Sequence, residues 1–283
     1  MCPPAFIEHF DALAPRYEAV LSDVWGVVHN GERATPEACE ALIKFRQQGG
    51  RVILITNAPR PSRSVMKQLE FFRVPRETYD GIVSSGDVTR EVILSRPGQT
   101  VCHIGPPRDK PIFDGLDVSF APLEGADYVI CSGLENDEIE TAEDYRPRLE
   151  QMLQRKLFMV CGNPDVVVER GNRLVYCAGA IADLYKQMGG EVLYAGKPYR
   201  PIYDAALAKL QPAPSRERIL AIGDSLRTDL AGAKAAALDF LFLTAGIHAE
   251  EFGAHADPQA LALQKAIAAA DKAPVAVMRE LRW

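Results

Sequence analysis

The chain has 283 residues, a formal net charge of −6 and a pI of about 5.5, and 47% of its residues are apolar. These values are typical of a globular protein that buries a sizeable core in one large or two modest domains. The acidic balance argues against nucleic acid or an anionic membrane as a partner, because both require clustered positive charge. A small anionic substrate stays compatible with this net charge, because it needs only one or two local cations.

The sequence carries no signal for export or for metal-binding cysteines. The first residues, MCPPAFIEHF, show neither the basic nor the long apolar region of a signal peptide, and no apolar stretch approaches the length that crosses a bilayer. The six cysteines form no CxxC pair, and no Cys/His set has zinc-ligand spacing. We therefore expect reduced, buried thiols and a cytoplasmic protein.

Short apolar runs alternate with helical patterns in the first part of the chain. An apolar approach ends on Asp23, and residues 35–49 follow with a helical pattern. That pattern has Thr at the cap position, Pro at the first helical position and Gly at its end. The alternation continues with a buried strand at 50–57, a helix at 61–74, a strand at 81–86 and a helix at 87–94.

Between roughly residues 90 and 183 the pattern changes. Several strand-like runs and one helical pattern near 141–155 form a block with its own apolar content. This block interrupts the outer alternation. We interpret residues 89–183 as a second domain, inserted into a first domain that is formed by residues 1–88 and 184–283.

The outer alternation returns after the insertion. It predicts strands at 192–196, 218–224 and 239–246, helices at 199–210 and 226–237, and a final Ala/Leu-rich helix at 257–270. Alternation of this kind predicts an α/β fold, a Rossmann-like doubly wound parallel sheet with helices on both faces. Ligands of such sheets bind beyond the carboxyl ends of the strands.

Polar residues stand where these strands end, and we expect them to converge on one edge of one parallel sheet. They are Asp23, Thr56, Asn57, Lys197 and Asp224, with Asp229 in the first turn of the helix that follows. Any one of them alone is explained as a helix cap or a turn residue. The whole set, in this order along the chain, indicates an active site.

The chemistry that fits is phosphoryl transfer through an aspartate. A carboxylate can attack phosphorus and form an acyl phosphate, but two anions repel, so a cation must bridge them. Mg²⁺ takes oxygen ligands, and Asp23 and Asp224 supply two carboxylates. Lys197, the Thr56 hydroxyl and the backbone N–H of Asn57 would hold the remaining phosphoryl oxygens as charge builds.

The set resembles the haloacid dehalogenase (HAD) superfamily. DVWGVV is similar to its first motif, ITN to its second, AGKP to its third and GDSLRTD to its fourth. The insertion between the second and third motifs resembles a class II cap. The segments ITNAPR, GNPD, GKPYRPIYDAAL and IGDSLRTDLAGA are most similar to class IIA, the subgroup of nitrophenyl, pyridoxal and nucleotide phosphatase-like proteins.

The resemblance implies a role for each matching residue. It makes Asp23 the nucleophile and, with the backbone carbonyl of Trp25, a metal ligand. It places Asp224 and Asp229 in the same metal site, and Thr56 and Lys197 at the phosphate. The GNPD turn is implied to face the active site, which makes Asn163 and Asp165 candidates for substrate binding. A small phosphorylated metabolite as substrate and a homodimer through the cap are implied as well.

The departure from the family pattern is Trp25, because most family phosphatases carry there an Asp that protonates the leaving oxygen. Three interpretations stay open. The substrate has a leaving group that needs little protonation, as in aryl or acyl phosphates. Another group replaces the acid, and His29 is the nearest titratable candidate. The alternative for His29 is a solvated loop histidine without a catalytic role. The leaving group is halide, as in metal-independent dehalogenases, although the carboxylate set of Asp224 and Asp229 favours phosphate.

The sequence therefore predicts a Mg²⁺-dependent phosphatase that acts on a small phosphorylated metabolite through an aspartyl phosphate. Two alternatives remain beside it. One is a metal-independent, dehalogenase-type hydrolase. The other is a catalytically weak protein that binds a phosphorylated ligand without releasing phosphate.

Overall fold

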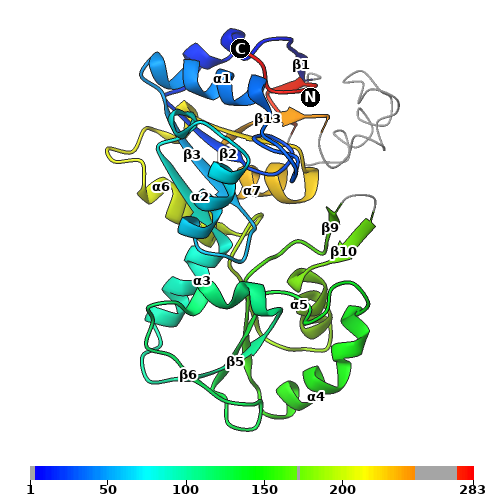
Figure 1. Cartoon of the computed structure of the whole chain (residues 1–283). Helices are drawn as coiled ribbons and strands as arrows, with labels where there is room; N and C mark the ends of the chain where they lie inside the picture. The colour runs from blue at the N-terminus through cyan, green and yellow to red at the C-terminus, as the bar shows by residue number, and fades with distance from the viewer. Residues whose placement is uncertain (1–3, 171–172, 246–272) are drawn as a thin grey trace. The chain divides into compact units, whose positions relative to one another are not determined.

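The structure, a computed structural model, describes residues 4–170, 173–245 and 273–283 (Figure 1). The chain divides into two compact units: unit 1 contains Met1–Thr56, Met66–Val83 and Tyr203–Trp283, and unit 2 contains Asn57–Val65 and Ser84–Ile202. The helix predicted at 257–270 lies outside the described residues. Among the described helices, none combines the length and the apolar character that a membrane span requires.

Unit 1 is built on a seven-stranded sheet. Its strand order is β1-β14-β13-β12-β2-β3-β4, and the neighbouring pairs from β1 to β3 are all parallel. The strands are β1 (Ala5–Phe6), β2 (Ala19–Asp23), β3 (Arg51–Thr56), β4 (Gly81–Ser84), β12 (Ile219–Gly223), β13 (Asp239–Leu243) and β14 (Ala276–Met278). This is the parallel α/β sheet that the alternating pattern predicts.

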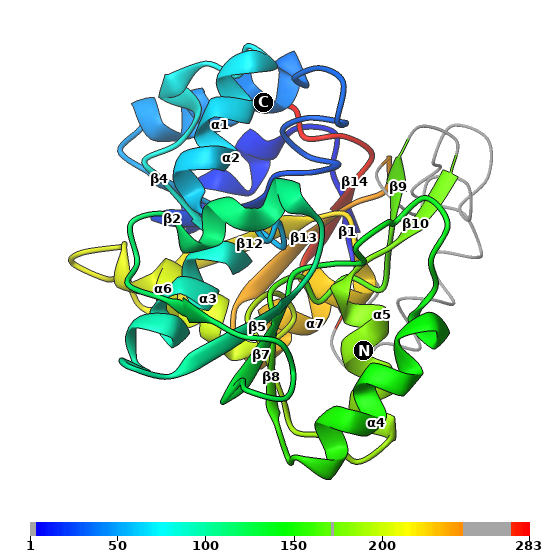
Figure 2. The same ribbon diagram turned by 60° about the horizontal axis from the view of Figure 1, so that its bottom comes forward.

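Helices cover both faces of this sheet, which explains the uninterrupted apolar runs of its strands. Every residue of β2 and β12 is buried, as in parallel sheets that are covered on both sides. Figure 2 shows α1 (Pro36–Gln47) and α2 (Ser62–Phe71) over one face and α6 (Arg200–Ala208) and α7 (Ala231–Ala235) over the other. In α1 the buried residues Ala38, Leu42 and Phe45 follow the helical spacing, and Thr35 stands at the cap position without a side-chain cap hydrogen bond.

Unit 2 contains a second parallel sheet, of five strands. Its order is β11-β8-β7-β5-β6, and all four neighbouring pairs are parallel. A separate antiparallel hairpin pairs β9 with β10. The strands of this unit are β5 (Thr100–Ile104), β6 (Ser119–Phe120), β7 (Tyr128–Cys131), β8 (Phe158–Cys161), β9 (Val167–Arg170), β10 (Arg173–Tyr176) and β11 (Val192–Tyr194).

Alternate side chains of β7 enter two different apolar clusters. Val129 and Cys131 pack with residues of α4 (Arg146–Gln154) and α5 (Ala178–Gln187). Tyr128 and Ile130 pack instead with residues of α3 (Ser85–Leu94) and of the 3-10 helix η4 (Pro107–Phe113). Because successive side chains of a strand point to opposite faces, the second sheet is also covered on both faces.

The strand that precedes Lys197 corrects one expectation from the sequence. We expected residues 192–196 to join the same sheet as Asp23, and this is wrong, because β11 pairs with β8 in the five-stranded sheet. Apolar periodicity identifies a strand but carries no information about its partner. The assignment of residues 89–183 to an inserted domain stays a prediction, and unit 2 takes in chain on both sides of that interval.

The described cysteines are free thiols, as the sequence analysis expected. Cys39, Cys131, Cys161 and Cys177 are buried, and Cys102 is half-buried. Burial raises the pKa of Cys131 to about 12, which keeps this thiol protonated and unreactive at neutral pH.

Candidate active site

Three aspartates of unit 1 form one buried cluster. Asp23 ends β2, Asp224 follows β12 directly, and Asp229 lies in the π-helical turn η7 (Leu226–Leu230). Carboxylate oxygens of the three residues lie within 4.8 Å of one another, and all three side chains are buried. They meet because β2 and β12 are parallel neighbours, so that both strands end at the same edge of the sheet.

Backbone N–H groups fix the orientation of two of these carboxylates. The N–H of Val24 donates to Oδ1 of Asp23 at 2.7 Å, and the N–H of Ser225 donates to Oδ2 of Asp229 at 3.1 Å. The Ser225 hydroxyl in turn accepts from the N–H of Thr228 at 3.2 Å, which caps the π turn. The turn therefore positions Asp229 through its own backbone.

Two glycines let the backbone approach the cluster more closely than any side chain permits. A Cβ at Gly26 would collide with the carboxylate of Asp224, and Gly26 also has a left-handed backbone with φ +78°. A Cβ at Gly223 would collide with the carboxylate of Asp229. Neither glycine was assigned this role from the sequence.

The cluster has the donor chemistry of a site for a hard divalent cation. Such ions bind carboxylate and carbonyl oxygens. Buried carboxylates that lie this close repel one another, and a cation between them offsets that repulsion. The described residues of the cluster therefore fit the predicted Mg²⁺, and Asp23, Asp224 and Asp229 are the side chains that would hold it.

Thr56 lies at the same edge of the sheet as Asp23. It is the last residue of β3, which pairs in parallel with β2, and Asp23 is in register with Ile55. The side chain of Thr56 is buried. The sequence prediction that Asp23, Thr56, Asp224 and Asp229 share one sheet edge is thus confirmed for unit 1.

The loop after β2 gives an unexpected environment to His29. We weighed His29 as a replacement acid against a solvated loop histidine, and the second interpretation is wrong, because His29 is only 4% exposed. Its Nδ1 accepts from the N–H of Gly31 at 2.9 Å, which places the imidazole proton on Nε2. Burial lowers the pKa of His29 to about 4, so the ring is uncharged at neutral pH. An imidazolium acid is therefore not available there at neutral pH.

In unit 2, the side chain of Asn57 holds the backbone of Lys197. Oδ1 of Asn57 accepts from the Lys197 N–H at 2.7 Å, and Nδ2 donates to the Lys197 carbonyl at 3.0 Å. Nδ2 also donates to Oδ1 of Asp165 at 2.9 Å. Because an ionised carboxylate only accepts hydrogen bonds, Asp165 determines which end of the Asn57 amide faces it.

These bonds change the interpretation of three candidate binding residues. The side chain of Asn57 is committed to Lys197 and Asp165, and its backbone N–H is the group that we expect at the phosphoryl oxygens. Asn163 accepts from the N–H of Asp165 at 3.1 Å and shapes the GNPD turn. Nothing in the local sequence pattern links positions 57, 165 and 197, and the sequence analysis therefore missed this arrangement.

A glycine of the AGKP motif makes the arrangement sterically feasible. A Cβ at Gly196 would collide with Oγ of Ser85 and with Oδ1 of Asn57. Gly196 directly precedes Lys197, which is only 2% exposed. The motif glycine therefore has a packing role that brings the Asn57 amide to the lysine backbone.

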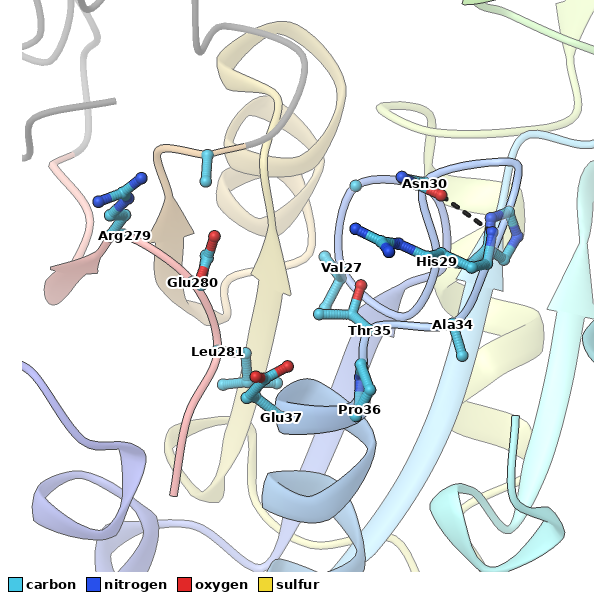
Figure 3. A pocket seen from close by; sticks show the side chains of 13 residues that line it. Val27, His29, Asn30, Ala34, Thr35, Pro36, Glu37, Arg279, Glu280 and Leu281 are labelled. Carbon is cyan, nitrogen blue, oxygen red and sulfur yellow. Dashed lines mark hydrogen bonds between the residues drawn. The ribbon is translucent and has the colours of Figure 1, made fainter. Parts of the chain in front are cut away.

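A cavity of about 520 Å³ lies in unit 1 beside the loop after β2 (Figure 3). Its lining comes from the stretch between Gly26 and Glu37, from Ala245 and from Arg279, Glu280 and Leu281. The three clustered aspartates are not among the described residues that line it. Gly26, which lines the cavity, lies against Asp224 of the cluster, and the charged residues of the lining have both signs.

Comparisons with known proteins agree with this fold. A family model described as haloacid dehalogenase-like hydrolase matches residues 20–119, and a HAD-hydrolase-like model matches residues 194–270. The crystal structure of a haloacid dehalogenase-like hydrolase from Brucella suis 1330 is 43% identical, with 98% of this chain and 100% of that chain covered and a TM-score of 0.85.

More distant relatives share most of their length with this chain. The ribonucleotide monophosphatase NagD of Escherichia coli strain K12 is 25% identical over 236 residues, which are 81% of this chain and 88% of NagD. The structure of a 4-nitrophenylphosphatase from Thermotoga maritima is 22% identical, with 94% of this chain and 95% of that chain covered and a TM-score of 0.72, which shows the same fold.

The protein belongs to the haloacid dehalogenase-like hydrolase family. Within that family it is a member of class IIA, the group of NagD-like and nitrophenylphosphatase-like proteins. The resemblance seen in the four sequence motifs is thereby confirmed.

Substitution of Gly26 by alanine should weaken Mg²⁺ binding, because the added Cβ displaces the carboxylate of Asp224. We expect Mg²⁺ affinity to fall at least about tenfold, or about 1.4 kcal/mol. The measurement is the increase in unfolding free energy on addition of Mg²⁺. Gly49→Ala is the matched control, because Gly49 also has a left-handed backbone, with φ +92°, but no atom within 4 Å of the added Cβ. Equal stabilisation of both variants by Mg²⁺ would contradict the prediction.

Substitution of Asn57 by aspartate should destabilise unit 2. The new carboxylate would face the Lys197 carbonyl and the Asp165 carboxylate, where Nδ2 now donates to both. We expect a loss of about 2–4 kcal/mol in unfolding free energy, measured by urea denaturation. Asn30→Asp is the control, since Asn30 is exposed and its Oδ1 only accepts, from two backbone N–H groups. The control should stay within about 0.5 kcal/mol of wild type, and equal losses would refute the assignment.

Proposed function

We propose that this protein is a Mg²⁺-dependent phosphatase that hydrolyses a small phosphorylated metabolite through an aspartyl phosphate on Asp23. The observation that carries the proposal is the buried cluster of Asp23, Asp224 and Asp229, at the sheet edge where family members bind their ligands. The relatives NagD and the 5'-nucleotidase YutF of Bacillus subtilis strain 168 are named for nucleotide phosphate hydrolysis, which supports a phosphate monoester as the substrate.

In the proposed reaction, Asp23 forms a bond to phosphorus while the bond from phosphorus to the leaving oxygen breaks. Bound Mg²⁺ supplies positive charge that offsets the repulsion between carboxylate and phosphate. Asp224, Asp229 and the backbone carbonyl of Trp25 are the groups that would hold the ion with Asp23. The Val24 N–H donates to Oδ1 of Asp23 and thereby keeps this carboxylate oriented. Water then hydrolyses the acyl phosphate and regenerates the carboxylate.

Thr56, Lys197 and the backbone N–H of Asn57 hold the phosphoryl oxygens in this proposal. The ammonium group of Lys197 provides charge, and the Thr56 hydroxyl provides one donor. Asn57 follows Thr56 directly in the chain and binds both the N–H and the carbonyl of Lys197. Asp165 acts through Asn57 by fixing its amide, and Asn163 shapes the same turn. We propose that both position the phosphate-holding groups.

Trp25 stands where family phosphatases carry an acidic residue, so the leaving group receives no proton from that side chain. The indole N–H donates a hydrogen bond but does not titrate near neutral pH. General acid catalysis contributes roughly 10²–10⁴ in rate. The proposed substrates are therefore esters with stable leaving groups, and alkyl phosphates should react slowly.

The two alternative functions fit the cluster less well. A metal-independent dehalogenase has no use for three carboxylates within 4.8 Å of one another, because halide leaves without a cation. A phosphate-binding protein without turnover would not need Asp23 oriented by the Val24 N–H. We also propose that the protein forms a homodimer through the cap and that it is cytoplasmic. Analytical sedimentation tests whether it is a dimer.

Asp23→Asn should abolish hydrolysis of 4-nitrophenyl phosphate, because the amide cannot form the acyl phosphate. We expect a fall of at least about a thousandfold in kcat. Asp11→Asn is the control, since Asp11 is exposed on unit 1. The nucleophile assignment would be wrong if Asp23→Asn turned over like wild type.

EDTA distinguishes the metal-dependent reaction from its rival in the same assay. Wild type should lose activity in excess EDTA and regain it with Mg²⁺. Activity that survives EDTA would support the metal-independent hydrolase instead.

Trp25→Asp should raise kcat for alkyl phosphates, because it supplies the missing acid beside the nucleophile. We expect an increase of about tenfold or more, toward the range of general acid catalysis. The measurement compares glycerol phosphate with 4-nitrophenyl phosphate, whose leaving group gains little from protonation. No increase with the alkyl ester, in a variant that is folded and binds Mg²⁺, would count against this account of Trp25.

A further inference from the structure

Trp25 presents a large aromatic ring to solvent in an otherwise buried stretch of chain. The side chain is 37% exposed, whereas Val24 and Val27 on either side of the loop are almost fully buried. Trp25 lies two residues after Asp23, on the loop that also brings Gly26 against Asp224. Trp25 therefore lies on the short segment between the proposed nucleophile and the glycine that contacts Asp224.

The indole is held on two sides by its own loop. A Cβ at Gly31 would collide with Cη2 and Cζ3 of the indole, so the six-membered ring lies directly against the Gly31 backbone. The ring also meets His29 edge to face, with centroids 5.6 Å apart and an interplanar angle of 81°. His29 in turn lies against Phe72, with ring centroids 4.8 Å apart. The indole therefore packs against His29, which itself packs against Phe72.

The backbone of the loop adds to this support. Trp25 and His29 form a bridge, His29 and Ala34 form a second one, and the N–H of Gly26 donates to the His29 carbonyl at 2.9 Å. Gly31 has φ +89°, a left-handed backbone that favours glycine. A ring that is fixed before a ligand arrives loses little conformational entropy on binding.

We propose that Trp25 is a stacking platform for the leaving group and selects phosphate monoesters whose leaving group carries a planar aromatic ring. The inference rests on the proposed phosphatase function and names the substrate class of that same site. Offset stacking of flat rings is favourable, and an exposed indole face is the side chain best suited to it. Saturated leaving groups, such as sugar or glycerol alcohols, do not gain this interaction.

The kinetic test separates stacking from leaving-group reactivity. The variants are Trp25→Leu, which removes the aromatic face, and Trp25→Phe, which keeps one. The substrates are 4-nitrophenyl phosphate, which has a ring, and acetyl phosphate, which has a good leaving group without one. We expect Trp25→Leu to raise KM for the aryl ester by roughly tenfold to a hundredfold more than KM for acetyl phosphate, the usual range for loss of ring stacking. Trp25→Phe should restore most of the aryl KM.

A change of equal size for both substrates, or no change for the aryl ester, would overturn the platform. Each of these outcomes leaves the phosphatase function standing, because wild type still hydrolyses the esters. If wild type hydrolysed no phosphate ester, the proposed function would fail first. Ligand binding then tests the platform without turnover.

The binding test uses the fluorescence of Trp25 itself. The chain has two tryptophans, and Trp283 lies edge to face against Phe10, with centroids 6.0 Å apart. Trp283→Phe therefore leaves Trp25 as the single indole, and adding Asp23→Asn prevents turnover. Phenyl phosphate, added with Mg²⁺, should change the emission of Trp25 until the site is saturated. Methyl phosphate, whose binding is followed by calorimetry, should leave the emission unchanged. Binding of phenyl phosphate without an emission change, or no binding well above the wild-type KM, would overturn the inference.

Discussion

Mutual repulsion among three buried carboxylates is the constraint on which the rest of this structure depends. At separations within 4.8 Å, two unit negative charges repel by roughly 3–4 kcal/mol when the effective dielectric constant is near 20. Such a cluster forms only if the backbone holds its members in place. The parallel pair β2 and β12 supplies two of them, and the π turn after Asp224 supplies the third. A divalent cation is the natural counterpart of this arrangement.

Glycine and backbone N–H groups carry out that positioning. Gly26 and Gly223 allow the chain to press against Asp224 and Asp229, and N–H groups bind Asp23 and Asp229. In unit 2, the backbone of buried Lys197 is also held in place. The side-chain amide of Asn57 binds both its N–H and its carbonyl. The peptide bond between Thr56 and Asn57 joins the two arrangements covalently. Each unit therefore prepares its own charged groups through backbone contacts.

The sequence predicted local features well and pairing poorly. Strands β3, β12 and β13 and helices α1 and α2 agree with their apolar periodicity because that signal is local. The partner of β11 was assigned wrongly, since periodicity does not specify which strand lies beside it. The burial of His29 depends on Phe72, far along the chain, and the bonds of Asn57 depend on Asp165 and Lys197. Long-range packing of this kind has no signature in a single sequence.

A tryptophan at position 25, which offers no titratable group, affects the two halves of the proposed reaction differently. In the first half, formation of the aspartyl phosphate depends on how well the leaving group departs unprotonated, so the substrate sets the rate. In the second half, water attacks an intermediate that is the same for every substrate, so the leaving group no longer affects the rate. Trp25 offers no base, and Nδ1 of the buried His29 already accepts from the N–H of Gly31. Better leaving groups therefore accelerate turnover only until hydrolysis of the intermediate becomes limiting. Beyond that point, substrates differ in KM and not in kcat.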